Sequence, residues 1–293
     1  MPCGYPSRRH FLQTAAAMAC VSQSANANAA SDQSQMRMGL VTYLWGQDMT
    51  LAELLAACES SGLLGVELRT QHNHAVEPEL SAAERAEVRR RFSDSPVKLV
   101  GYGANCEYHS SKPEQVKSNI QQTKRYIELM HDCGGSGVKV KPNSLPKDVD
   151  PKKTVQQIGM ALNEVARYGQ EFGQQIRLEV HGSGTSQLPI VRDIMAVADH
   201  PNVAVCWNCN DQDMEGAGLE DNFNMVRDRF GETLHVRELF VKDYPYDQLF
   251  KLLLRSAYKG WVLLEARTNP ADKVAAMTEQ RKLFEQLSQS PGS

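Results

Sequence analysis

The chain has 293 residues, of which 41% are hydrophobic, 23% charged and 7% aromatic, which is an ordinary balance for a globular protein. Its formal net charge is −3, so the composition gives no sign of a basic face for nucleic acid. No apolar run approaches the ~20 residues of a membrane-spanning helix, and the length suits one large domain, such as an eightfold α/β barrel of about 250 residues.

The N-terminus has the three regions of an export signal. Arg8 and Arg9 are followed by the apolar pair Phe11 and Leu12, then by an alanine-rich stretch over residues 14–21 and Ala-x-Ala patterns within residues 25–30. This order predicts a twin-arginine signal peptide over residues 1–29, a barrel domain over residues 30–293, and a periplasmic or otherwise exported product. An unstructured or amphipathic N-terminal arm is the alternative.

From residue 36 onward, short apolar runs alternate with longer helical patterns. Strands are expected at residues 38–44, 65–69, 97–102, 138–141, 176–181, 203–208, 234–239 and 261–267. Helices are expected at residues 51–60, 82–92, 113–133, 151–172, 188–198, 220–229, 246–258 and 271–287. Strict alternation requires a parallel sheet covered by helices, and eight such units favour closure. The predicted fold class is therefore α/β, a single (β/α)8 TIM barrel with eight parallel strands and outer helices.

Local signals support several of these helix ends. Thr50, Pro113 and Pro151 are suitable capping or first-turn residues, and Gly62 and Gly134 suit helix ends. No Gly-x-Gly-x-x-Gly pattern follows the first strand, which argues against a dinucleotide-binding domain.

Five cysteines follow the signal segment: Cys58, Cys106, Cys133, Cys206 and Cys209. An odd number argues against a fully paired disulfide framework. Cys206 and Cys209 have a Cys-x-x-Cys spacing, but residues three apart on a strand point to opposite faces. No second pair completes a zinc site, so buried structural thiols are expected.

Several predicted strands carry ionisable residues on one face, although strands of a parallel barrel are normally apolar on both faces. In the fifth strand Arg177, Glu179 and His181 alternate with apolar neighbours. Four other strands show the same alternation, with Glu67 and Arg69, Lys139 and Lys141, His235 and Arg237, and Glu265 and Arg267. Unpaired buried charges are costly, and barrel active sites lie at the C-terminal ends of the strands. These residues therefore predict a polar site in the lumen, with internal salt bridges as the alternative.

Five short motifs lie in order on the predicted strands: Gly65-Val66-Glu67-Leu68-Arg69, Leu178-Glu179-Val180-His181-Gly182, Val205-Cys206-Trp207-Asn208, Leu234-His235-Val236-Arg237-Glu238 and Gly260-Trp261-Val262-Leu263-Leu264-Glu265. In this order, and over essentially all of residues 36–287, the chain resembles the xylose isomerase-like barrel superfamily of sugar isomerases and epimerases. The resemblance implies one divalent metal ion, Mn, Mg, Co or Zn, held by Glu179, Asn208, His235 and Glu265.

One of these ligand positions departs from the pattern of the family, which has Asp where this chain has Asn208. An amide oxygen can coordinate a hard cation, but the site loses a negative charge. Three interpretations stay open: a weaker metal site, a site completed by Asp211 or another group, and a barrel that has lost the metal.

The resemblance and the paired carboxylates predict a metal-dependent sugar isomerase or epimerase that abstracts a proton next to a carbonyl, through an enediolate. Glu179 and Glu265 are the expected acid/base pair. Substrate contacts are expected from His181, Glu67, Lys139, Lys141, Arg237, Arg267 and Trp45, although Trp45 could equally be a core residue.

Other functions stay open as alternatives. One is a lyase or dehydratase that acts on keto-sugars or keto-glycosides by the same chemistry, and another is a non-catalytic sugar-binding barrel. A phosphodiesterase with three zinc ions is disfavoured, because it needs a basic DNA-binding face. The expected partner is a small carbohydrate, neither nucleic acid nor membrane is expected, and a homo-oligomer is an open alternative.

Overall fold

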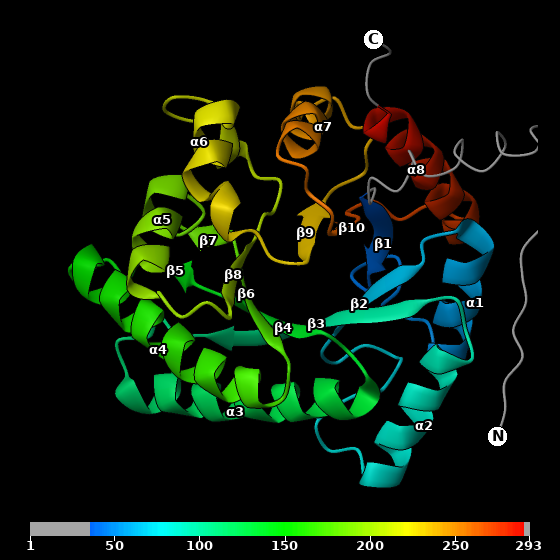
Figure 1. The fold of residues 1–293 in the computed structure, drawn as a ribbon, viewed down its shortest axis with the longest axis horizontal. Helices are drawn as coiled ribbons and strands as arrows, with labels where there is room; N and C mark the ends of the chain where they lie inside the picture. The colour runs from blue at the N-terminus through cyan, green and yellow to red at the C-terminus, as the bar shows by residue number, and fades with distance from the viewer. Residues whose placement is uncertain (1–35, 290–293) are drawn as a thin grey trace, which may run out of the picture. The chain divides into compact units, whose positions relative to one another are not determined.

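Eight parallel strands surrounded by eight helices make up residues 36–289, the part of the chain that the computed structural model describes (Figure 1). The barrel strands are β1 (Arg37–Val41), β2 (Gly65–Arg69), β3 (Lys98–Glu107), β4 (Gly137–Lys141), β6 (Gln175–Glu179), β8 (Val203–Cys206), β9 (Thr233–Val236) and β10 (Trp261–Leu264). The helices are α1 (Leu51–Ser61), α2 (Ala82–Ser93), α3 (Pro113–Cys133), α4 (Pro151–Glu171), α5 (Leu188–Val197), α6 (Leu219–Val226), α7 (Tyr246–Arg255) and α8 (Lys273–Ser288). The predicted (β/α)8 barrel is confirmed. The expected signal peptide lies outside the described residues.

The structure adds short elements that the sequence patterns do not predict. Beyond β4 and β6, two strands of two residues each, β5 (Asn143–Ser144) and β7 (Gly182–Ser183), pair in parallel as a separate small sheet. Two short 3-10 helices, η1 (Asp211–Met214) and η2 (Arg227–Arg229), flank α6. These additions lie in the connections, so they leave the eightfold repeat unchanged.

The ends of the helices follow the local sequence signals. α1 begins at a capping box in which the Thr50 side chain accepts from the backbone N–H of Glu53, and it ends at Gly62 with a φ of 78°. α2 begins at an equivalent capping box of Ser81 and Glu84. Such caps satisfy backbone groups that have no partner within the helix.

The barrel closes at a sparse seam between β8 and β9. The other neighbours form parallel ladders in the order β8-β6-β4-β3-β2-β1-β10-β9, with register shifts in the β2–β3 and β3–β4 pairs. At the seam the backbone N–H of His235 donates to the carbonyl of Trp207 at 2.7 Å, and an isolated parallel bridge joins Asn208 to His235. Closure of the barrel therefore places Asn208 directly beside His235.

Strand β3 presents glycines where the lumen is most crowded with charged side chains. A Cβ atom at Gly101 would lie 2.8 Å from Nη1 of Arg177. A Cβ atom at Gly103 would lie 3.1 Å from Oε1 of Glu67 and 3.2 Å from Cε of Lys139. The missing side chains of β3 thus make room for the charged side chains of β2, β4 and β6.

Arg177 occupies the lumen toward the N-terminal ends of the strands. Its guanidinium donates to the carbonyl of Val100 at 2.6 Å, to Oγ of Ser136 at 2.9 Å and to Oε2 of Glu232 at 2.9 Å. These contacts satisfy a buried charge. For Arg177, the alternative interpretation of an internal salt bridge therefore holds. Arg177 shares a strand face with Glu179 but lies near the opposite end of the barrel.

The five cysteines within residues 36–289 are all buried and free, as expected: Cys58, Cys106, Cys133, Cys206 and Cys209. Burial raises the pKa of the Cys58 thiol to about 12, which is typical of a structural cysteine rather than a reactive one. None of the helices over the same residues is both long and apolar enough to cross a membrane.

Candidate metal and catalytic site

Glu179, His235 and Glu265 meet in the lumen at the C-terminal ends of β6, β9 and β10. One ligand atom from each lies within 4.8 Å of the other two. Nδ1 of His235 is 3.7 Å from Oε1 of Glu179 and 3.8 Å from Oε2 of Glu265, and it has no hydrogen-bond partner within residues 36–289. These separations are too long for hydrogen bonds. They suit three atoms that share one cation at about 2 Å each, so the triad fits a divalent metal ion.

Each carboxylate oxygen of Glu179 accepts a hydrogen bond, one from a charged side chain and one from a neutral side chain. Lys139 donates from Nζ to Oε2 of Glu179 at 2.5 Å, and Asn208 donates from Nδ2 to Oε1 at 2.9 Å. Burial raises the pKa of Glu179, but the Lys139 ammonium and His235 outweigh it and hold the pKa well below its usual value. Glu179 is therefore ionised and fixed in place.

Glu67 lies behind His235, on the side away from the triad. Its Oε1 is 3.3 Å from Nε2 of His235, both side chains are fully buried, and neither Glu67 oxygen has a hydrogen-bond partner within the described residues. Burial raises the pKa of Glu67, but His235 and Lys139 lower it by more. A carboxylate on one ring nitrogen orients the other nitrogen toward a metal. The structure thus places Glu67 against His235 rather than on the open surface of the lumen, where substrate contacts are expected.

His235 has the electrostatic environment of a proton-binding or metal-binding imidazole. Burial lowers the pKa of His235, but the acidic side chains around it, Glu67 and Glu179 among them, raise it well above its usual value. A metal ion and a proton both neutralise the same surrounding carboxylates, so each would compete with the other for Nδ1.

Glu265 is the more accessible of the two facing carboxylates. Its side chain is 10% exposed, compared with 2% for Glu179. Arg69 donates from Nη1 to Oε1 of Glu265 at 3.0 Å, which leaves Oε2 facing His235. Arg69 was expected on the lumen face, but strand periodicity alone does not identify Glu265 as its partner.

A buried carboxylate that the sequence analysis did not single out fixes the segment after Glu265. Oε1 of Glu238 accepts hydrogen bonds from the backbone N–H groups of Arg267 and Thr268 at 2.9 and 2.7 Å. Trp45 is 1% exposed and donates from Nε1 to the carbonyl of Thr268 at 3.0 Å. Trp45 is therefore a core residue, which is the second of its two expected roles, and its ring has no surface for a sugar.

The other side chains that are expected to contact substrate differ in their exposure and in the contacts that they already make. Arg237 donates from Nε to the carbonyl of Cys209 at 3.2 Å and lies 3.5 and 3.4 Å from carboxylate oxygens of Asp211 and Asp243. Asp211, which could have completed a metal site, thus faces Arg237 and is 81% exposed. Arg267 is exposed, whereas Lys141 and His181 are partly buried at the C-terminal end of the barrel.

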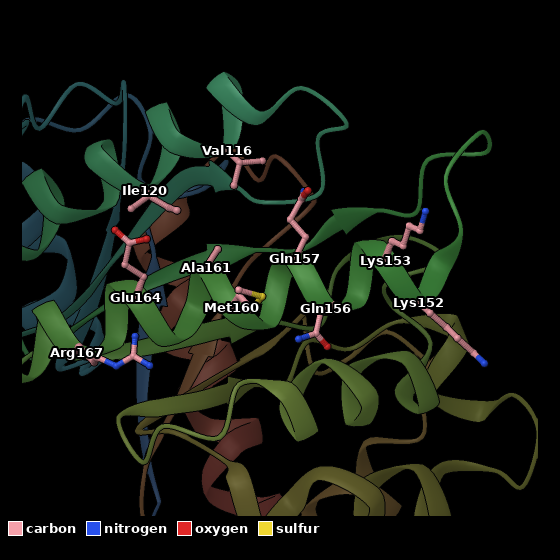
Figure 2. Close-up of a pocket in the computed structure, with 10 residues that line it drawn as sticks. All are labelled: Val116, Ile120, Lys152, Lys153, Gln156, Gln157, Met160, Ala161, Glu164 and Arg167. Carbon is pink, nitrogen blue, oxygen red and sulfur yellow. The ribbon is translucent and has the colours of Figure 1, made fainter.

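A separate groove of about 700 Å³ lies on the outer face of the barrel, between α3 and α4. Figure 2 shows its lining, with Val116 and Ile120 on α3 and Met160 and Gln157 on α4. It contains none of the charged lumen residues. This groove therefore has no part in the chemistry of the triad.

Comparisons with known proteins agree with this architecture. The sequence pattern of the Xylose isomerase-like TIM barrel family matches residues 55–287, and the chain belongs to that family. No curated protein matches the chain.

Three solved structures illustrate the likeness in fold. The 3-keto-D-glucoside 4-epimerase YcjR from E. coli is 14% identical, with a TM-score of 0.72, over 86% of this chain and 100% of that one. The probable 3-DHS dehydratase AsbF from Bacillus anthracis is 13% identical, with a TM-score of 0.68, over 85% and 99% of the two chains. The IOLI protein with a bound zinc atom is 14% identical, with a TM-score of 0.72, over 86% and 98%.

Proposed function

We propose that the chain is a divalent-metal-dependent sugar isomerase or epimerase that removes a proton from a carbon next to a carbonyl. The observation that carries this proposal is the pair of carboxylates, Glu179 and Glu265, that face Nδ1 of His235 in the lumen. Membership of the xylose isomerase-like family and the epimerase among the similar structures support it. The site lies at the C-terminal end of the barrel, where TIM-barrel enzymes carry out their chemistry.

Glu179, His235 and Glu265 would hold the cation, with Asn208 as a fourth donor if its amide turns its oxygen inward. When bound, a divalent cation polarises neighbouring substrate oxygens as a Lewis acid. In the structure, the side-chain amide of Asn208 donates its N–H to Glu179. Asn208 could therefore coordinate the cation only with its amide group in the opposite orientation.

The two carboxylates have different tasks in this proposal. Lys139 and Asn208 fix Glu179 in its ionised form, so Glu179 anchors the site. Glu265 is more exposed, and it accepts the substrate proton and returns it to the enediolate. Arg69 orients Glu265 through a charge-assisted hydrogen bond to its Oε1.

Elimination is the second candidate function, because the same proton abstraction can expel a leaving group. The dehydratase among the similar structures favours this alternative. A non-catalytic sugar-binding barrel is a third, for which the neutral Asn208 is the supporting observation.

Deuterium exchange tests the proposal. The purified protein, with Mg²⁺ or Mn²⁺ added, is incubated with ketohexoses and 3-keto-glycosides in D₂O, and exchange at the C–H next to the carbonyl is followed by NMR. Glu265→Gln keeps size and an oxygen donor but removes the proton acceptor, so the exchange rate should fall by about 10²–10⁴. Glu59→Gln, on the exposed face of α1, is the matched control. A folded Glu265→Gln protein that exchanges at the wild-type rate would contradict the mechanism, and elimination products would favour the lyase.

A further inference from the structure

Most of the basic side chains in and above the lumen already have acidic partners. The ion pairs are Arg69 with Glu265, Lys139 with Glu179, Arg177 with Glu232, and Arg237 with Asp211 and Asp243. Lys141 differs from all of them. It is partly buried, and its ammonium forms no ion pair or hydrogen bond with any of residues 36–289. The neighbouring acid on β3, Glu107, instead approaches His109 at 3.8 Å.

The small β5–β7 sheet holds Lys141 beside His181. Lys141 ends β4 and His181 directly precedes β7, and the sheet pairs Asn143 with Gly182 just beyond them. The two backbones approach so closely that a Cβ at Gly182 would lie 2.0 Å from the carbonyl oxygen of Asn143. Asn143 itself adopts a left-handed φ of 68°. Strained backbone of this kind persists where the surrounding structure needs it, which is often at a functional site.

His181 also lacks a partner. Its Nδ1 is buried and makes no hydrogen bond within the described part of the chain. Burial and the charge of Lys139 lower the pKa of Lys141, against the opposing effects of Glu179 and Glu107. Within residues 36–289 the Lys141 ammonium thus has no ion-pair partner, and Nδ1 of His181 has no hydrogen-bond partner.

We propose that Lys141 and His181 form an anion subsite, which selects sugars that carry a carboxylate or a phosphate. Lys141 and His181 lie two residues beyond Lys139 and Glu179 along the chain, at the C-terminal end of the barrel, so one end of a sugar would reach the triad while its anionic group meets Lys141. A carboxylate or phosphate accepts charge-assisted hydrogen bonds from an ammonium, and it would compensate the Lys141 charge, which no side chain within residues 36–289 pairs. This inference rests on the proposed function, because it names the substrate class of that site.

Binding experiments test the subsite without turnover. Isothermal titration calorimetry of the metal-supplemented and metal-free protein compares D-glucose with D-glucuronate and D-glucose 6-phosphate, and D-galactose with D-galacturonate. We expect at least one anionic sugar to bind about ten-fold or more tightly than its neutral counterpart, and added NaCl to weaken that preference. Whichever of D-glucuronate and D-glucose 6-phosphate binds more tightly identifies whether the subsite takes a carboxylate or a phosphate.

Lys141→Met should abolish the preference for the anionic sugar over its neutral counterpart, and Lys141→Gln serves if the methionine variant does not fold. Lys98→Met is the matched control, because Lys98 is exposed at the opposite, N-terminal end of β3. Equal binding of anionic and neutral sugars by the wild-type protein would overturn the inference. So would a preference that survives Lys141→Met, because the metal or another residue would then bind the anion. If the protein exchanges the C–H of a neutral keto-sugar in D₂O but binds anionic and neutral sugars equally, the subsite alone is overturned. The proposed function then stands.

Discussion

Lys139→Met should destabilise the protein strongly, because it leaves the Glu179 carboxylate without its counter-ion. The two side chains are 0% and 2% exposed, and their charged atoms are 2.5 Å apart. After the substitution, the neutral Asn208 amide is the one donor to the Glu179 carboxylate left among the described residues. Removing one partner of a buried ion pair typically costs about 3–5 kcal/mol. For a domain of this size that corresponds to a fall in Tm of roughly 6–20 °C.

A double-mutant cycle isolates the interaction between the two charges. Glu179→Gln leaves Lys139 as the unpaired member, whereas Lys139→Met combined with Glu179→Gln removes both charges. The double variant should therefore lose less stability than the sum of the single losses. Urea unfolding in EDTA, followed by circular dichroism, measures all four free energies of unfolding. Lys124→Met is the control, because it breaks a surface pair with Glu164 at 2.8 Å and should cost less than about 1 kcal/mol.

The same variants report on the metal site. A divalent cation that binds Glu179 would replace part of the charge that Lys139 supplies, so Mn²⁺ should raise the Tm of Lys139→Met by more than that of the wild-type protein. Additive losses in the cycle, or a Lys139→Met protein as stable as the Lys124→Met control, would refute the role of the buried pair.

Two further predictions concern other parts of the chain. Asp213, in η1, is fully buried and accepts hydrogen bonds from Tyr244 and from the backbone of Asn210, at 2.6 and 3.0 Å. Burial raises the pKa of Asp213 to about 7. At pH values between the pKa of the unfolded chain and that of the folded protein, the native state therefore binds more protons than the unfolded state. The free energy of unfolding thus falls as the pH rises. The contribution of Asp213 to the free energy of unfolding should fall by about 4 kcal/mol between pH 4 and pH 8. Urea unfolding of Asp213→Asn should lack that part of the pH dependence. Identical pH profiles for the variant and the wild type would contradict a buried carboxyl that binds a proton. For the N-terminus we propose export, and replacing Arg8 and Arg9 with Lys should leave an uncut chain in the cytoplasm on fractionation, whereas unchanged periplasmic accumulation would exclude a twin-arginine signal.

The sequence patterns predicted the barrel because each strand and helix has its own local signal. Eight apolar runs separated by amphipathic helical segments leave few arrangements other than a closed parallel sheet. The two-residue strands β5 and β7 were missed because Asn143–Ser144 and Gly182–Ser183 carry no apolar alternation. Their pairing depends on the close approach of two strand ends, which no local pattern records.

Within the site, strand periodicity predicted which face a side chain occupies but not its depth in the lumen. Arg177 and Glu179 share one face of β6, yet Arg177 binds Glu232 near one end of the barrel and Glu179 binds Lys139 near the other. The buried Trp45 donates a hydrogen bond to the carbonyl of Thr268, which is 223 residues away in the sequence. Such contacts follow from three-dimensional packing, so the roles of these residues required the structure.

The most direct test of the metal-centred account is a calorimetric titration of the purified protein with Mn²⁺. One Mn²⁺ should bind per chain, and binding should be greatly weakened in Glu265→Gln and His235→Gln because each variant removes a ligand of the triad. Asn208→Asp should bind Mn²⁺ more tightly than the wild type, because a charged oxygen donor replaces the amide. Absence of binding to both the wild-type and the Asn208→Asp proteins, with both folded, would contradict the account.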